Sequence, residues 1–208
     1  MYKRIIKRII DLLLSTIGIV VLAIPMLVVA IIIKINSPGP ALFKQKRVGI
    51  HKTEFTMLKF RSMPIDVPHY MPTNEFNAVD RINKFQRFIR KSSIDELPQL
   101  FNIWIGDMSI VGPRPVIPNE YDLIEARDRH GANDVKPGLT GWAQINGRDE
   151  LVGEAKAKMD GEYVQKMSFL FDCKCIIKTV FMVLRFKGVV EGGKQTDHEE
   201  VQEKVGLP

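Results

Sequence analysis

Residues 12–33 read LLLSTIGIVVLAIPMLVVAIII, an apolar run that contains no charged side chain. A helix of about 20 such residues is long enough to span the hydrocarbon core of a bilayer. A cleavable signal peptide has a shorter apolar region followed by a small-residue cleavage motif, and the sequence has neither property. The run is therefore predicted to form a membrane helix.

Two features bear on whether this helix crosses the membrane. Pro25 lies within the run, where a proline removes an amide donor and kinks a helix. A crossing helix carries an excess of lysine and arginine at its cytoplasmic end, whereas here cations flank both ends. The flanking cations are Lys3, Arg4, Lys7 and Arg8 before the run and Lys34, Lys44, Lys46, Arg47 and Lys52 after it. A kinked single-pass helix and a re-entrant helix both remain open on these residues.

Adjacent carboxylates, Asp95 and Glu96, lie in the sequence SSIDELPQL at residues 92–100. A carboxylate can act as a nucleophile toward phosphorus or bind a magnesium ion. Further along, Arg114 stands between two prolines that restrict its backbone, and an arginine fork suits phosphate oxygens. The two patterns together indicate chemistry on a phosphate or diphosphate.

The carboxylates also have a structural interpretation. Ser93 followed three residues later by Glu96 has the spacing of a capping box at a helix start, and Asp95 in a first turn would complement the helix dipole. Adjacent helical residues point about 100° apart, so the two carboxylates are expected to have different functions. The apolar face predicted for the following helix consists of Leu97, Leu100, Phe101 and Trp104.

Composition limits the classes of function. The 208 residues suffice for one domain with a core and an appendage. A net charge of +6 beside an apolar segment indicates that the protein's partner is anionic lipid rather than nucleic acid. The sequence has no motif that binds nucleic acid. Cys173 and Cys175 lack the companion pair of a zinc site and suggest apolar positions in a reducing compartment. The four histidines show no ligand or triad spacing.

A β-hairpin and several helices are predicted elsewhere. Residues 41–49 and 53–61 alternate around a glycine-containing turn, and the second strand would place Lys59 and Arg61 on one face. The remaining predictions are a proline-rich loop at 64–77, a basic helix at 81–90, an amphipathic helix at 118–129, a glycine-rich loop at 136–148 and one or two helices at 154–187. The last region has an apolar stripe with cations at its margins, which fits a core helix or one in a membrane interface.

Seven motifs occur in order between about Arg4 and Val183. They are the proline-broken helix, Ser-Pro-Gly-Pro, Lys-Phe-Arg-Ser-Met, Ser-Ile-Asp-Glu-Leu-Pro-Gln, Ser-Ile-Val-Gly-Pro-Arg-Pro, Pro-Gly-Leu-Thr-Gly-Trp-Ala-Gln and Ser-Phe-Leu-Phe-Asp. In these motifs the chain resembles the bacterial sugar transferases, the small monotopic phosphoglycosyl transferases.

The resemblance implies an α+β fold. A re-entrant membrane helix broken at Pro25, a small β-hairpin and amphipathic interfacial helices would surround a compact catalytic domain. The expected boundaries are 1–36 for the membrane helix, 37–190 for a cytoplasmic, membrane-associated catalytic domain and 191–208 for a polar tail. The protein would lie on the cytoplasmic face of the bacterial inner membrane.

The resemblance also implies a reaction. A phospho-sugar would pass from a nucleoside diphosphate sugar, most simply a UDP-sugar, to polyprenyl (undecaprenyl) phosphate, releasing UMP. Asp95 would be the nucleophile that carries a covalent phospho-sugar, and Glu96 would hold Mg²⁺. The predicted substrate-binding residues are Arg114, Lys59, Arg61, Arg90, Gln144, Arg148 and Asp172.

Two other functions are compatible with a membrane helix. A single-pass membrane glycosyltransferase would move only the sugar and release UDP, and a membrane-anchored scaffold would need no Mg²⁺. Neither explains the paired carboxylates together with the proline-framed arginine. The identity of the sugar, the glycoconjugate pathway and the oligomeric state are not indicated by any residue pattern.

Overall fold

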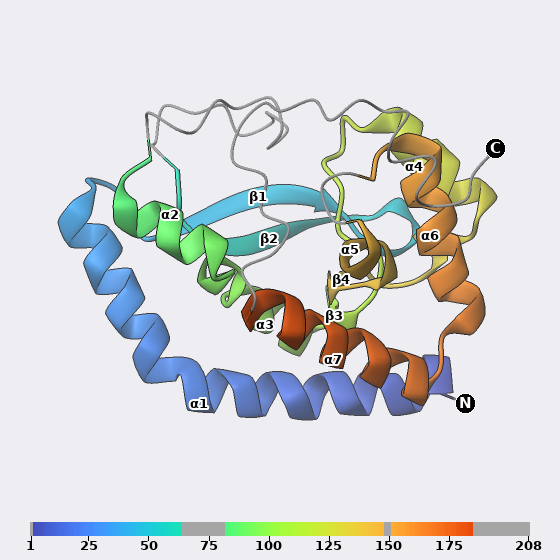
Figure 1. Cartoon of the computed structure of the whole chain (residues 1–208), viewed down its shortest axis with the longest axis horizontal. Helices are drawn as coiled ribbons and strands as arrows, with labels where there is room; N and C mark the ends of the chain where they lie inside the picture. The colour runs from blue at the N-terminus through green and yellow to red at the C-terminus, as the bar shows by residue number, and fades with distance from the viewer. Residues whose placement is uncertain (1, 64–81, 148–150, 185–208) are drawn as a thin grey trace.

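The computed structural model describes residues 2–63, 82–147 and 151–184 (Figure 1). Within them, a long N-terminal helix, two two-stranded sheets and six further α-helices form the α+β fold predicted from the sequence. The loop predicted at 64–77 and the tail predicted at 191–208 lie outside the described residues.

The apolar run forms helix α1 (Lys7–Asn36), which follows a π-helical turn, η1 (Tyr2–Ile6). Pro25 lies inside α1, so the structure has one continuous helix where a break was predicted. Figure 1 shows α1 bent, with its second half turned away from the line of the first. A proline removes one amide donor and crowds the preceding turn, which bends a helix without ending it.

Both halves of α1 pack on the same domain. In the first half, Gly18 lies against Leu100, whose Cδ1 would be 3.1 Å from a β-carbon at that glycine. In the second half, Met26 and Ile33 are buried in a cluster with Phe60. Among the described residues, α1 is the one helix long and apolar enough to cross a membrane.

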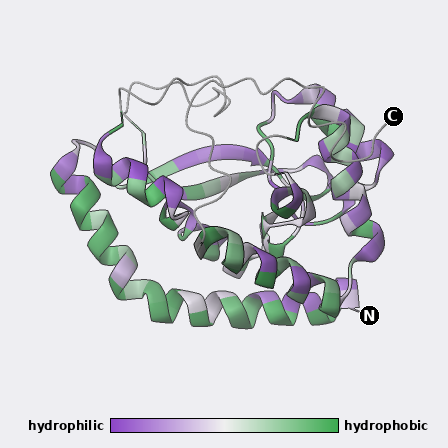
Figure 2. Cartoon of the chain, viewed as in Figure 1, coloured by the Kyte–Doolittle hydropathy of each residue, from purple (hydrophilic) through white to green (hydrophobic). Residues whose placement is uncertain are grey.

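Helix α1 consists of hydrophobic residues over most of its length (Figure 2). Its exposed large hydrophobic residues include Leu13, Ile17, Val20, Val21, Ile24, Leu27 and Ile35. Further exposed apolar side chains lie on α3 (Gln99–Ile105) and α7 (Phe169–Leu184), among them Trp104, Phe169 and Leu170. Apolar surface of this extent is typical of a membrane or protein interaction site.

The predicted hairpin is confirmed. Strands β1 (Leu42–Val48) and β2 (Glu54–Phe60) pair antiparallel around a short 3₁₀ turn, η2 (Ile50–Lys52). Asn102 of α3 docks on β2, because its side-chain amide donates to Thr56 O at 2.8 Å and its oxygen accepts from the Leu58 amide at 3.0 Å. The hairpin is thereby fixed against the segment that carries the two carboxylates.

A second sheet replaces part of the loop predicted at 136–148. Strand β3 (Ser109–Val111) pairs parallel with β4 (Gly138–Thr140), and α5 (Trp142–Asn146) follows. A β-carbon at Gly138 would collide with the amide nitrogen of Gly112, so these glycines permit the close approach of the two backbones. The glycine content of this segment indicated a loop, whereas in the structure the glycines allow β3 and β4 to pair closely.

The remaining helices cover the two sheets. They are α2 (Lys84–Lys91), α4 (Tyr121–Arg129), α6 (Gly153–Lys166) and α7. The basic and amphipathic helices predicted before and after the carboxylates correspond to α2 and α4, and the region predicted as one or two helices contains two. Arg127 of α4 donates to Asp160 of α6 in a buried ion pair of 2.6 Å. That pair joins the two helices.

The capping box that the spacing of Ser93 and Glu96 allowed as an alternative does not form. Ser93 has φ 57° and ψ 17°, without a side-chain capping bond, and Asp95 and Glu96 lie in a 3₁₀ turn, η3 (Ile94–Glu96), before α3. The apolar face predicted for the following helix is also partly wrong. Leu100 is buried as expected, but Phe101 and Trp104 are 41% and 49% exposed because Gln99, Asn102 and Ile103 occupy the inner face.

Candidate active site

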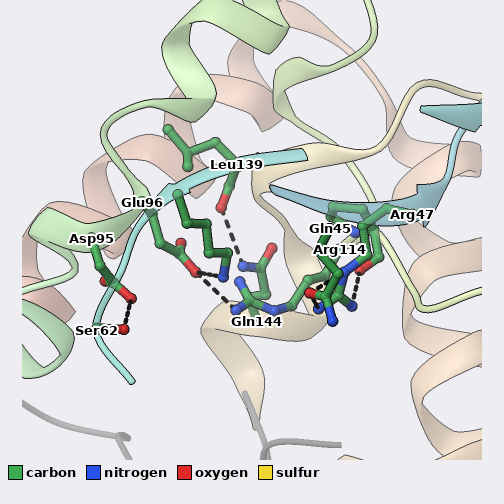
Figure 3. Close-up of polar contacts among 10 residues, drawn as sticks. Gln45, Arg47, Ser62, Asp95, Glu96, Arg114, Leu139 and Gln144 are labelled. Atoms are coloured by element: carbon green, nitrogen blue, oxygen red, sulfur yellow. Dashed lines mark hydrogen bonds and ion pairs between the residues drawn. The ribbon is translucent and has the colours of Figure 1, made fainter. Parts of the chain in front are cut away.

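The 3₁₀ turn η3 directs the two neighbouring carboxylates to different partners (Figure 3). Asp95 Oδ2 accepts a hydrogen bond of 3.2 Å from the Ser62 hydroxyl, just beyond β2. Glu96 Oε1 instead meets two cations from other parts of the chain. The expectation that the carboxylates have different functions therefore matches their surroundings.

Glu96 is the anion at the centre of a cation cluster. Lys59 Nζ and Arg114 Nη2 each donate to Glu96 Oε1 at 2.9 Å. Burial opposes ionisation of this carboxyl, but Arg114 and Lys59 hold its pKa well below the usual range. Burial also lowers the pKa of Lys59, against the attraction of Glu96. A buried carboxylate with two cationic donors remains charged at neutral pH.

Asp95 is in the opposite electrostatic situation. Its side chain is buried, and burial raises its pKa from 3.8 to about 6, with Glu96 adding to the rise while Lys59 and Arg90 oppose it. A carboxylate with a pKa near the working pH is ionised yet weakly solvated, which suits a nucleophile or proton acceptor. Ser62, which the sequence analysis did not select, is the hydrogen-bond donor to this group.

Arg114 is held in place by its neighbouring prolines and by backbone bonds on both sides. The Gly138 amide donates to Pro113 O at 2.8 Å, and Arg47 Nη1 donates to Pro115 O at 3.0 Å. The Arg47 guanidinium also donates to Gln45 Oε1, at 2.6 Å from Nη2 (Figure 3). Burial and the nearby Arg114 lower the pKa of Arg47 to about 10.

Neither Arg47 nor Gln45 was selected from the sequence. Both lie on β1, for which the sequence pattern predicted only a strand of a hairpin. The spacing of two residues places their side chains on the same side of a strand, and this is the signal that could have paired them. Their proximity to Pro115 depends on tertiary structure and has no local signature.

Two other predicted site residues lie near this cluster. Gln144 Nε2 donates to Leu139 O at 3.2 Å, and its Oε1 is buried without a hydrogen-bond partner among the described residues (Figure 3). Arg90 is near enough to Asp95 to favour the ionised carboxylate, and its Nη1 is likewise a buried donor without a partner in the described chain. Buried polar atoms without partners are candidates for substrate hydrogen bonds.

Two other predicted substrate-binding residues, Arg61 and Asp172, make hydrogen bonds outside this cluster. Arg61 lies just after β2, and its guanidinium donates to Pro38 O at 2.6 Å and Ser37 O at 2.8 Å at the end of α1. The Nε of Arg61 is a buried donor without a partner among the described residues, so its role in substrate binding stays a prediction. Arg148 lies outside the described residues.

Asp172 is the second of these residues. Lys7 Nζ donates to its Oδ2 at 2.6 Å, and the Tyr163 hydroxyl donates to its Oδ1 at 2.9 Å. The carboxylate is thus fully engaged in joining α7 to the start of α1, where Tyr2 also donates to it. Its position in a family motif indicated a site residue, but its contacts are those of a structural tie.

The binding of a magnesium ion by Glu96 stays a prediction, which the chemistry of the carboxylates allows. Among the described residues, no cluster of three His, Cys, Asp or Glu side chains could hold a metal. Enzymes that bind phosphates commonly hold Mg²⁺ through one or two carboxylates, completed by phosphate oxygens and water. In the described chain the hydrogen bonds reach Oδ2 of Asp95 and Oε1 of Glu96, which leaves the second oxygen of each for a metal.

A buried carboxylate beside a carboxylate held by two cations is an arrangement that suits chemistry on phosphate groups. Residues 2–186 match the bacterial sugar transferase family, and the chain belongs to it. It is accordingly an enzyme of the phosphoglycosyl transferase class.

Relatives of known name agree with this membership. The chain is 38% identical over 202 residues to the uncharacterized sugar transferase EpsL of Bacillus subtilis (strain 168), covering 97% of this chain and 96% of that protein. It is 40% identical over 189 residues to the UDP-glucose:undecaprenyl-phosphate glucose-1-phosphate transferase of Escherichia coli (strain K12). That match covers 86% of this chain and 40% of the relative.

A third relative has a different sugar in its name. The UDP-N-acetylgalactosamine-undecaprenyl-phosphate N-acetylgalactosaminephosphotransferase of Aeromonas hydrophila is 34% identical over 187 residues, covering 86% of this chain and 44% of the relative. Several of the matched relatives are thus more than twice as long as the part this chain resembles.

Proposed function

We propose that the protein transfers a sugar phosphate from a UDP-sugar to undecaprenyl phosphate, giving undecaprenyl diphosphate-sugar and UMP. The observation that carries this proposal is the buried Asp95, whose pKa is raised to about 6, next to the Glu96 cluster. The donor and acceptor classes are those in the names of the relatives from Escherichia coli and Aeromonas hydrophila.

In the first step, the Asp95 carboxylate attacks the phosphorus that carries the sugar. A bond forms between its oxygen and that phosphorus, and the bond from phosphorus to the bridging oxygen of the diphosphate breaks, so UMP leaves with the electron pair. Lys59 and Arg114 offset the negative charge that gathers on the phosphate oxygens, and Arg114 supplies a planar donor fork. A buried, weakly solvated nucleophile beside fixed cations lowers the cost of bringing two anions together.

In the second step, an oxygen of undecaprenyl phosphate attacks the same phosphorus. The bond to Asp95 breaks, the carboxylate is restored, and the lipid diphosphate-sugar is released. A soluble donor and a lipid acceptor thereby use one site in turn. Mg²⁺, held by Glu96 and the open oxygen of Asp95, would neutralise diphosphate charge and aid departure of UMP.

The proposed location is the cytoplasmic face of the bacterial inner membrane, with α1 re-entering the leaflet it came from. Support comes from the two ends of α1, which are tied to the same domain. Lys7 at one end pairs with Asp172, and the carbonyls of Ser37 and Pro38 at the other end accept from Arg61. A domain on one side of a bilayer cannot hold both ends of a crossing helix. The transfer would be the first membrane step of glycoconjugate synthesis, and it would use UDP-sugars from the cytoplasm.

The decisive experiment identifies the nucleotide product. Purified protein is incubated with undecaprenyl phosphate, Mg²⁺ and a panel of UDP-sugars, and the nucleotides are separated. Release of UMP with a lipid product is the expected result. Release of UDP would instead indicate a glycosyltransferase that moves only the sugar, and the proposal would be wrong.

The covalent route has its own test. Initial rates measured at several concentrations of both substrates should give parallel double-reciprocal lines, because UMP leaves before the lipid reacts. Intersecting lines would indicate direct transfer between the two substrates. Brief reaction with a labelled donor in the absence of lipid should also leave label on the peptide that contains Asp95.

A further inference from the structure

Asp11 is a buried carboxylate at the start of the apolar segment of α1. Its side chain is 3% exposed. Its Oδ2 accepts from the Ser109 hydroxyl at 2.7 Å and its Oδ1 accepts from the Ile110 amide at 2.9 Å. Both partners belong to β3, so the membrane helix is bonded directly to the strand that leads to Arg114.

A carboxylate in such a position needs those two donors. Burial of a carboxylate costs several kcal/mol unless hydrogen bonds replace the lost water. The strand needs the carboxylate in return. The Ser109 amide donates to Pro137 O on the β4 side, and successive amides in a strand point to opposite edges. The Ile110 amide therefore lies on the open edge of β3, where Asp11 takes the place of a third strand.

The backbone between this contact and Arg114 has little freedom. The Gly112 amide donates to Thr140 O and the Gly138 amide to Pro113 O, both at 2.8 Å. Pro113 and Pro115 fix their own φ angles on either side of the arginine. A shift of β3 away from α1 is thus transmitted along a short, bonded segment to the guanidinium that meets Glu96.

We propose that Asp11 is a positioning residue, which sets the place of β3 and through it the place of Arg114 in the active site. This inference rests on the proposed function, because the importance of Arg114 is that of a phosphate-binding group. The membrane helix then does more than attach the domain to lipid. It is a structural support of the phosphate site.

Three variants separate this role from general stability. Asp11→Leu removes both acceptors with a side chain of similar size that suits an apolar helix. Asp11→Asn retains the contacts, since its oxygen can accept from Ile110 and its amide can donate to Ser109. Thr16→Ala is the control on the same helix, because Thr16 is exposed and its hydroxyl donates only within α1, to Leu12 O at 2.7 Å.

The first measurement is amide hydrogen exchange in lipid nanodiscs. Asp11→Leu should speed exchange in peptides covering residues 109–116, with no change in α4 or α6, while Asp11→Asn and Thr16→Ala should match the wild type. Unchanged exchange over β3 in Asp11→Leu would overturn the inference. This readout does not depend on activity, so it decides the matter even where a variant is too slow to assay.

The second measurement is kcat/KM for the UDP-sugar. Asp11→Leu should lower it by about 10- to 100-fold, since small misplacements of a substrate-binding group have effects of that size. Asp11→Asn should recover most of the activity. In an Arg114→Ala background, Asp11→Leu should add little further loss, because both changes remove the same contribution.

Losses that multiply in the double variant would show that Asp11 acts independently of Arg114, and the inference would be wrong. Failure of the proposed function has a different signature. The wild type would then release no UMP at all, whereas the exchange results over β3 would still report on the contact between Asp11 and the strand.

Discussion

Replacing Asp95 with asparagine should abolish turnover and at the same time stabilise the protein above neutral pH. An amide cannot serve as the nucleophile, so UMP release should stop. The stabilisation follows from the pKa of Asp95, which burial raises from 3.8 to about 6. The folded protein therefore holds the proton more tightly than the unfolded chain, and ionisation of Asp95 costs stability as the pH rises.

The raised pKa of Asp95 sets both the size of this stabilisation and the pH range in which it is seen. A pKa raised from 3.8 to about 6 corresponds to about 3 kcal/mol of folding free energy. The contribution of the protonated carboxyl is fully present below pH 3.8 and is lost as the pH rises through about 6. Asparagine is not subject to this loss, so at pH 8 the variant should unfold about 6–12 °C above the wild type.

The assay is thermal unfolding of both proteins in the same nanodiscs at pH 4 and pH 8. The melting temperatures should differ at pH 8 and converge at pH 4, where Asp95 is largely protonated. A suitable control is Asp128→Asn. Asp128 is exposed and pairs with Lys52, and this pairing lowers the pKa of Asp128 instead of raising it. A variant Asp95→Asn that is less stable than the wild type at pH 8 would refute the reasoning.

Three further predictions concern catalysis and topology. The rate of UMP release should rise with pH around a midpoint of about 6, because Asp95 must lose its proton before it can attack, and a flat profile between pH 5 and pH 8 would contradict that role. Arg114→Lys should lower kcat/KM by about 10-fold or more, since lysine cannot supply a planar fork, whereas the exposed Arg129→Lys should leave it unchanged. In whole cells, a cysteine in place of Lys3 should be shielded from a membrane-impermeant thiol reagent added outside. Labelling of this cysteine in a chain that keeps Pro25 would show a crossing helix. Adding Pro25→Ala should increase such labelling by favouring a straight helix of spanning length, and an unchanged level would mean that Pro25 is not what returns the chain.

Local pattern was sufficient for much of the fold. The hairpin follows from alternation around a turn, and the membrane helix follows from length and apolarity. The Glu96 cluster was also partly predictable, because Arg114 was predicted to bind phosphate, the family resemblance implied Lys59 as a substrate-binding residue, and both meet Glu96. These predictions rest on residue chemistry and on motifs that lie close together in the chain.

What could not be predicted depends on contacts between distant segments. Ser93 has the spacing of a helix cap, but its left-handed backbone excludes that use. Arg61 has the alternation of a site residue, but two of its guanidinium nitrogens donate to carbonyls just after α1, which is a contact between distant segments. Asp172 is similar, since nothing near it in the sequence indicates that its partner is Lys7.

The ties between α1 and α7 have a consequence for the order of folding during synthesis. Lys7 and Asp172 are 165 residues apart, so α1 leaves the ribosome long before its partner has been made. Contacts of such high sequence separation are costly to close in the unfolded chain, so this tie is expected to form late. Helix α1 can pack on Phe60 and Leu100 as soon as those segments have been synthesised, whereas its tie to α7, the last described helix, can form only after that helix has left the ribosome.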